Sequence, residues 1–125
     1  MNTKILFVDD EENILLAYAR SLRKRFQMDL APGGREALYR LKNEGPFAVI
    51  ITDMRMPGMD GLQVIQAVRD YCREKMKHSI PEIMLTAYND DRVKESALRL
   101  GVKEFLLKPF KVEEFLKVLE HNLGC

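Results

Sequence analysis

The sequence has little of what marks a secreted, membrane-spanning or nucleic-acid-binding protein. Its two cysteines, Cys72 and Cys125, have no motif spacing, so we expect reduced thiols in a cytoplasmic protein. No apolar run approaches the roughly 18 residues that a membrane span needs, and the first residues do not form a signal peptide. Lys and Arg number 20 against 19 Asp and Glu, whereas nucleic-acid-binding proteins normally carry a basic excess.

The 125 residues are the length of one domain, and a hydrophobic content of 46% is sufficient for a core. Short apolar segments alternate with segments of helical periodicity, without a repeat or a linker. The expected strands are 5–8, 28–31, 47–52, 80–86 and 102–107, and the expected helices are 11–25, 35–43, 62–76, 90–100 and 113–123. This alternation predicts a parallel α/β sheet with helices on both faces.

Ligands of such sheets bind beyond the carboxyl ends of the strands. Asp9 and Asp10 follow the first expected strand, and Asp53 follows the third. Thr86 and Lys108 lie at the ends of the fourth and fifth. A nucleotide-binding fold would carry a glycine-rich loop after its first strand, where this chain has two acids. Because three converging carboxylates repel one another, the pattern indicates a site for a hard cation such as Mg²⁺.

Each of these residues also has a simpler structural interpretation. Asp9 and Asp10 could be the N-cap and first-turn acid of the following helix. Asp53 could begin a turn, Thr86 could cap a helix and Lys108 could be a solvated charge. Their coincidence at four strand ends favours one shared site. There, Mg²⁺, an ammonium and a hydroxyl would neutralise a phosphoryl group carried by a carboxylate.

Four segments resemble the motifs of the receiver domain of two-component response regulators, the fold of chemotaxis-type regulators. They are 7–12 (FVDDEE), 52–61 (TDMRMPGMDG), 85–87 (LTA) and 107–110 (LKPF). The resemblance covers essentially the whole chain and implies a flavodoxin-like, doubly wound sheet with strand order 2-1-3-4-5. It also implies a single receiver domain over residues 1–125, either complete or, as Gly124-Cys125 slightly favours, part of a longer response regulator.

The resemblance implies a phosphorylation-dependent switch centred on Asp53. This residue would accept a phosphoryl group from a sensor histidine kinase, a phosphotransfer protein or a small phosphodonor. Asp10, Asp53 and the backbone carbonyl of Arg55 would bind Mg²⁺ directly, and Asp9 would assist through water. The domain would assist its own phosphorylation and dephosphorylation without turning over an external substrate.

The same resemblance assigns the phosphate-binding and switch residues. Thr86 and Lys108 would bind the phosphoryl oxygens, the small Ala87 would leave room for them, and Arg55 would lie at the mouth of the site. On phosphorylation Thr86 would move inward and Phe105 would rotate behind it. The surface formed by the fourth helix, fifth strand and fifth helix would then change for an output domain or a downstream protein. Simple core packing is the alternative interpretation of Phe105.

Three further features bear on this interpretation. The Lys108–Pro109 peptide bond is expected to be cis in this family. The exit of the third helix, 71–79, is charged and about one turn longer than in compact relatives, so it is either solvated or a partner contact. Arg55 and Tyr88 are bulky and lie where family members tune the loss of phosphate to water, which predicts a phosphoryl state lasting minutes or more.

Two competing functions remain open at this stage. A haloacid-dehalogenase-type phosphatase also forms an aspartyl phosphate. Such enzymes resemble one another in having a second acid two residues after the nucleophile, and this chain has Arg55 at that position. A degenerate receiver could act as an interaction module without phosphorylation. The sequence shows no DNA-binding helix-turn-helix, and we expect no direct contact with nucleic acid or membrane through this domain. The last helix, 113–123, lacks the arginine-rich pattern that resembles the dimer face of the transcription-factor subfamily, so we expect no dimer of that kind.

Overall fold

The computed structural model describes residues 4–76, 78–87, 91–102, 104–108 and 110–122. Its strands are β1 (Lys4–Val8), β2 (Gln27–Ala31), β3 (Val49–Asp53), β4 (Glu82–Ala87) and β5 (Glu104–Lys108). Its helices are α1 (Glu12–Leu22), α2 (Gly34–Glu44), α3 (Gly61–Tyr71), α4 (Asp91–Leu100) and α5 (Val112–Asn122), with a π-helical turn at Cys72–Met76. The strands are parallel in the order β2-β1-β3-β4-β5, which confirms the expected doubly wound sheet.

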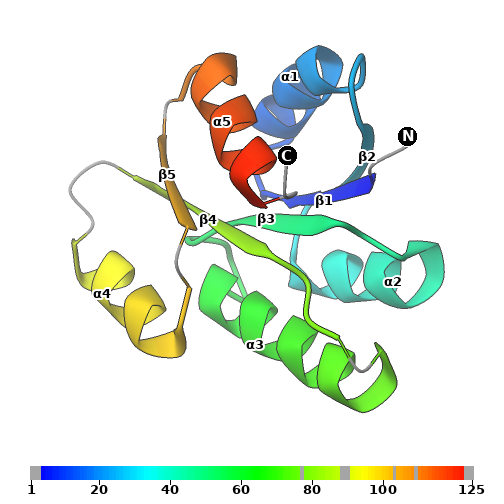
Figure 1. The fold of residues 1–125 in the computed structure, drawn as a ribbon. Helices are drawn as coiled ribbons and strands as arrows, with labels where there is room; N and C mark the ends of the chain where they lie inside the picture. Colours follow the sequence, from blue (N-terminus) through cyan, green and yellow to red (C-terminus); the bar gives the residue numbers. More distant parts are fainter. Residues whose placement is uncertain (1–3, 77, 88–90, 103, 109, 123–125) are drawn as a thin grey trace.

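The helices form two layers around this sheet. Figure 1 shows α1 and α5 on one face, and α2, α3 and α4 on the other. Successive residues of a strand point to opposite faces. In β1, Ile5 and Phe7 therefore join the core under α1 and α5, while Leu6 and Val8 join the core under α2 and α3. None of the helices among the described residues is long and apolar enough to cross a membrane.

Several expected boundaries are wrong, each for a local reason. Helix α1 ends at Leu22 rather than Arg25, and the chain continues in a turn in which the backbone N–H groups of Arg25 and Phe26 both donate to the Leu22 carbonyl. The expected helix 62–76 is α-helical only to Tyr71 and then continues as the π-helical turn. The sequence pattern could not show these changes, since apolar spacing over so few residues does not reveal which carbonyl each backbone N–H group binds.

The buried thiol of Cys72 leads to a first prediction. Cys72 is 3% exposed, and burial raises the pKa of its thiol, with the nearby Glu82 carboxylate adding to the effect. The thiolate is the reactive form. In a Cys125→Ser background, we expect Cys72 to react with a disulfide reagent at pH 8 about a hundredfold more slowly than in the denaturant-unfolded chain. Equal rates in the folded and unfolded chain would contradict the burial of this side chain.

Candidate functional site

The carboxyl ends of β1 and β3 bring the predicted acids together. These two strands are neighbours, and Val8 is paired with Thr52, so Asp9 follows β1 beside Asp53 at the end of β3. The chain leaves β1 toward β2 on one side, while β3 lies on the other. This is the point where the strand order reverses and where such sheets bind ligands. Carboxylate oxygens of Asp9, Asp10 and Asp53 all lie within 4.8 Å of one another.

Lys108, the last residue of β5, reaches this cluster directly. Its Nζ lies 2.7 Å from Asp9 Oδ2 and 3.2 Å from Asp53 Oδ2, and 3.9 Å from Glu11 Oε1. The sequence interpretation paired Lys108 only with phosphoryl oxygens, so this ion pair between residues 99 positions apart is a new finding. The ammonium already neutralises part of the charge that the acids bring together.

The three acids differ in their surroundings. Asp9 is fully buried and accepts hydrogen bonds from Lys108 Nζ and from the backbone N–H of Glu11. Asp10 is exposed. The N-cap of α1 is Glu11, not Asp9 or Asp10, which argues against the simpler capping interpretation. A cluster of one buried, one nearly buried and one exposed carboxylate fits Mg²⁺, which is held by few carboxylates and keeps several waters.

Burial and charge determine the ionisation of the two central groups. The pKa of Asp53 is raised above its ordinary value of 3.8, chiefly by burial, with the Asp9 charge acting in the same direction and Lys108 opposing both. Burial by itself would lower the pKa of Lys108. Its hydrogen bond to Asp9 and the negative charges of Asp53 and Asp9 together outweigh burial, so the pKa of Lys108 is also raised. At Asp53 the Asp9 charge acts in the direction that the sequence predicts for converging acids, but burial has the larger effect.

The loop after Asp53 is held by the start of α3. Asp60 caps this helix reciprocally with Gln63, each side chain accepting a hydrogen bond from the other's backbone N–H. The Gly61 N–H donates to the Met54 carbonyl at 2.8 Å. A Cβ at position 61 would lie 2.4 Å from the Asp53 carbonyl oxygen, so only glycine allows this approach. The sequence reasoning treated Gly61 as a loop residue and missed this role.

A second support fixes the chain beyond Lys108. The rings of Tyr18 and Phe110 stack with their centroids 4.0 Å apart, and the Tyr18 hydroxyl donates to the Phe110 carbonyl at 2.9 Å. Phe115 of α5 packs against both rings. This cluster anchors the segment just after β5 and therefore helps to hold Lys108 in the site. The sequence placed Tyr18 within the expected helix 11–25 and did not show this role.

The remaining predicted residues lie around this centre. Thr86 is buried within β4 and is not a helix cap, since α4 begins at Asp91. Arg55 is exposed on the loop that follows Asp53. Phe105 is partly buried, pairs with Met84 across β4 and β5, and lies with its ring centroid 5.4 Å from Lys94 Nζ of α4.

Some expectations fall outside what the structure describes. Ala87 is the last residue of β4, but its side chain is not described. Tyr88 and Pro109 lie outside the described residues, and so does the predicted cis bond before Pro109. The described residues instead contain a cis bond at Gly45–Pro46, which the sequence reasoning did not predict.

Comparison with known proteins agrees with this geometry. Residues 5–120 match the family model for the response regulator receiver domain. The chain is 36% identical over 115 residues to the alkaline phosphatase synthesis transcriptional regulatory protein PhoP of Bacillus subtilis, covering 91% of this chain and 45% of that protein. It is 33% identical over 122 residues to the regulatory protein AtoC of Escherichia coli, covering 96% of this chain and 25% of that protein. The chain therefore spans less than half the length of these relatives.

Solved structures show the same similarity. The chemotaxis protein CheY4 of Vibrio cholerae aligns with a TM-score of 0.86 and 33% identity over 98% of this chain and 100% of that chain. A structure described as adenylate cyclase from Rhodopirellula baltica aligns with a TM-score of 0.87 and 34% identity over 99% and 89% of the two chains. The family match leaves the phosphatase alternative without support. The chain belongs to the receiver domain family of two-component response regulators.

Proposed function

We propose that this receiver domain is a phosphorylation-dependent signalling switch whose phosphoacceptor is Asp53. The observation that carries the proposal is the cluster of Asp9, Asp10 and Asp53 with the Lys108 ammonium in contact with two of these acids. A cluster built only for stability would not place repelling carboxylates around a buried one, because burying charge costs free energy. Phosphoryl transfer needs this arrangement of acids and a cation.

Each residue of the site has its own role in phosphoryl transfer. A carboxylate oxygen of Asp53 attacks the phosphorus of the donor, and the bond from phosphorus to the donor's leaving atom breaks. Lys108 and the Thr86 hydroxyl bind the transferred phosphoryl oxygens, and Arg55 lies at the mouth. Asp10, Asp53 and the Arg55 carbonyl would hold Mg²⁺, with Asp9 assisting. When bound, the ion would neutralise charge on the phosphoryl group and the acids.

The domain acts between a donor of phosphoryl groups and a partner that recognises its surface. A sensor histidine kinase or phosphotransfer protein supplies the phosphoryl group, and an output domain or downstream protein reads the surface of α4, β5 and α5. The chain is one receiver domain of a cytoplasmic signalling protein and not a turnover enzyme. Lys94 of α4 lies with its Nζ 5.4 Å from the centroid of the Phe105 ring, so α4 contacts the aromatic residue that would move in the switch.

Intact mass spectrometry tests this function directly. The protein is incubated with acetyl phosphate and Mg²⁺, and we expect a mass increase of one phosphoryl group that is absent when EDTA replaces Mg²⁺. The adduct should be lost in hydroxylamine, which cleaves acyl phosphates. No mass increase with Mg²⁺ present would favour the interaction-only alternative.

The lifetime of the phosphoryl group gives a second prediction. Arg55 is exposed beside Asp53, where a bulky side chain restricts the approach of water. We expect the phosphoryl group to last for minutes or more, and the double variant Arg55→Ala/Tyr88→Ala to lose it about tenfold faster. The decay is followed by intact mass after removal of the donor. An unchanged lifetime would show that neither side chain limits hydrolysis. Arg73→Ala, at a distant exposed arginine, is the control and should leave the lifetime unchanged.

A further inference from the structure

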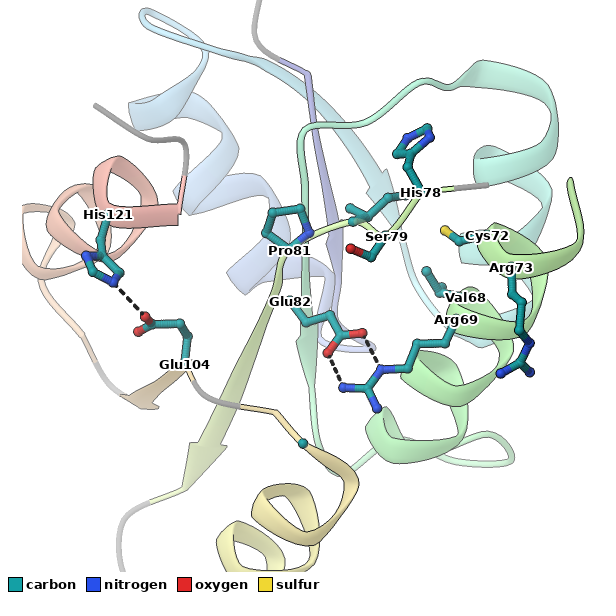
Figure 2. Close-up of a pocket in the computed structure, with 12 residues that line it drawn as sticks. Val68, Arg69, Cys72, Arg73, His78, Ser79, Pro81, Glu82, Glu104 and His121 are labelled. Atoms are coloured by element: carbon teal, nitrogen blue, oxygen red, sulfur yellow. Dashed lines mark hydrogen bonds and ion pairs between the residues drawn. The ribbon is translucent and has the colours of Figure 1, made fainter. Parts of the chain in front are cut away.

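Arg69 of α3 joins three elements at the end of the molecule opposite the acidic cluster. Its Nε and Nη2 donate to the two Glu82 carboxylate oxygens at 2.8 and 2.7 Å, and its Nη1 donates to the Leu100 carbonyl. Glu82 is the first residue of β4, and Leu100 is the last of α4. Figure 2 shows the guanidinium facing the Glu82 carboxylate within a groove of about 920 Å³. Such a paired fork has a defined geometry as well as charge.

The carboxyl-terminal end of α4 is fixed at this point. Gly101 has φ of 97°, and the N–H groups of Gly101 and Val102 donate to the Leu98 and Ala97 carbonyls, which is a Schellman motif. The two hydrogen bonds of that motif do not use the Leu100 carbonyl, which accepts a hydrogen bond from Arg69. The positive charge of Arg69 also interacts favourably with the negative end of the helix dipole. A Cβ at Gly101 would lie 3.7 Å from Arg69 Nη2, so the guanidinium packs against this turn.

Little of α4 is buried, although Val93 packs against the core cluster that contains Ala97. Ala97 is the only buried residue among the ten of this helix, all of which the structure describes. A groove of about 430 Å³, lined by Gln66 of α3 and by Ser96 and Leu100 of α4, lies between the second half of α4 and α3. A second groove, of about 420 Å³, lies between Arg55 in the loop after Asp53 and Val93 in the first turn of α4. Within the described residues, the first turn of α4 thus borders a groove that also reaches the loop after Asp53.

We propose that Arg69 is a positioning residue of the switch, the pivot about which α4 turns when Asp53 is phosphorylated. This inference rests on the proposed function. The guanidinium ties the end of α4 to α3 and to the start of β4, the strand that carries Thr86 at its other end. Displacement at the phosphorylation site therefore moves the first turns of α4 into or out of the groove at Val93 while the last turn stays in place.

Hydrogen exchange of α4 tests the pivot, with beryllofluoride and Mg²⁺ as the phosphoryl analogue. In the unmodified protein, we expect the analogue to change exchange at residues 91–94 at least about threefold more than at residues 98–102. In Arg69→Met, basal exchange at residues 98–102 should rise about tenfold, since a hydrogen bond to a charged donor is lost. The analogue should then change both ends of α4 to a similar extent.

Two variants accompany Arg69→Met. Gly101→Ala loosens the same end of α4 through its positive φ while the Arg69 side chain and its hydrogen-bonding groups remain, and it should also abolish the difference between the two ends. This variant keeps the test decisive if Arg69→Met does not fold. Arg73→Met removes an exposed arginine four positions further along the chain and should leave the difference intact.

The outcomes separate the pivot from a simple helix cap. If Arg69→Met and Gly101→Ala raise basal exchange at residues 98–102 but leave the analogue's effect concentrated at residues 91–94, Arg69 only caps α4 and the pivot is refuted. An equal response of both ends in the unmodified protein refutes the pivot alone. If the unmodified protein shows no response to the analogue and takes no phosphoryl group from acetyl phosphate, the proposed function falls and the pivot falls with it.

Discussion

Asp53→Asn is expected to abolish phosphorylation and, at the same time, to stabilise the unphosphorylated protein. The amide cannot form an acyl phosphate, so the mass increase with acetyl phosphate and Mg²⁺ should disappear. Asp70→Asn, a change at an exposed acid on α3, should leave the mass increase unchanged. Phosphoryl transfer to Asp53→Asn at the rate of the unmodified protein would place the phosphoacceptor elsewhere.

The stabilisation follows from the direction of the pKa shift. Burial raises the pKa of Asp53 above 3.8, so the folded protein binds its proton more tightly than the unfolded chain does. The charged form therefore destabilises the fold, with a penalty that is absent below about pH 3.8 and fully present above the folded pKa. At pH 7 in EDTA, Asp53→Asn should raise the free energy of unfolding by about 1 kcal/mol.

Denaturant titration at two pH values measures this effect. The gain from Asp53→Asn should shrink as the pH falls toward 4, and it should also shrink when Mg²⁺ is added, because the ion stabilises only the protein with an intact site. Asp10→Asn provides the matched control, since Asp10 belongs to the same cluster but is exposed and should change stability little. A loss of stability in Asp53→Asn would show that the ion pair with Lys108 outweighs burial.

Lys108→Met is expected to have the largest effect on stability. Asp9 is fully buried, and Lys108 is the cation within 2.7 Å of it. Removing the ammonium leaves the buried carboxylate with the Glu11 N–H and the nearby Asp53 charge. Breaking a buried ion pair on one side costs about 3 kcal/mol, and we expect a loss of that size in EDTA. Thermal unfolding with and without EDTA measures it.

Magnesium should offset part of this loss. Because Lys108 competes as a cation at the same acids, Lys108→Met should bind Mg²⁺ about tenfold more tightly, which a calorimetric titration can detect. The double variant Asp9→Asn/Lys108→Met should regain most of the lost stability, since it removes the buried charge as well. Lys111→Met, at an exposed lysine just beyond β5, should behave like the unmodified protein. Loss of Mg²⁺ affinity in Lys108→Met would contradict this account of the site.

The location of the candidate site was largely predictable. The spacing of apolar residues identifies each strand and helix from a short stretch of sequence, and the order of these elements is read along the chain. The apolar run ending at Asp53 predicts a buried strand, and alternation with helices predicts a parallel sheet whose strand ends meet. These two facts predict that the acids, Thr86 and Lys108 lie at the same edge of the sheet, and no measured interatomic distance is needed for that prediction. The boundary at Leu22 and the π-helical turn after Tyr71 were not predictable, since competing backbone hydrogen bonds decide them.

The residue types at the strand ends, and hence the charge and chemistry of the site, can be read directly from the chain of amino acids. The contacts that these residues make depend on the fold. Lys108 pairs with Asp9 before any phosphate is present, and Gly61 must be glycine because the Asp53 carbonyl lies against it. Arg69 shows the same limit, since its partners Glu82 and Leu100 are 13 and 31 positions away. Contacts of this kind depend on how helices pack on the sheet, which no local pattern of residues records.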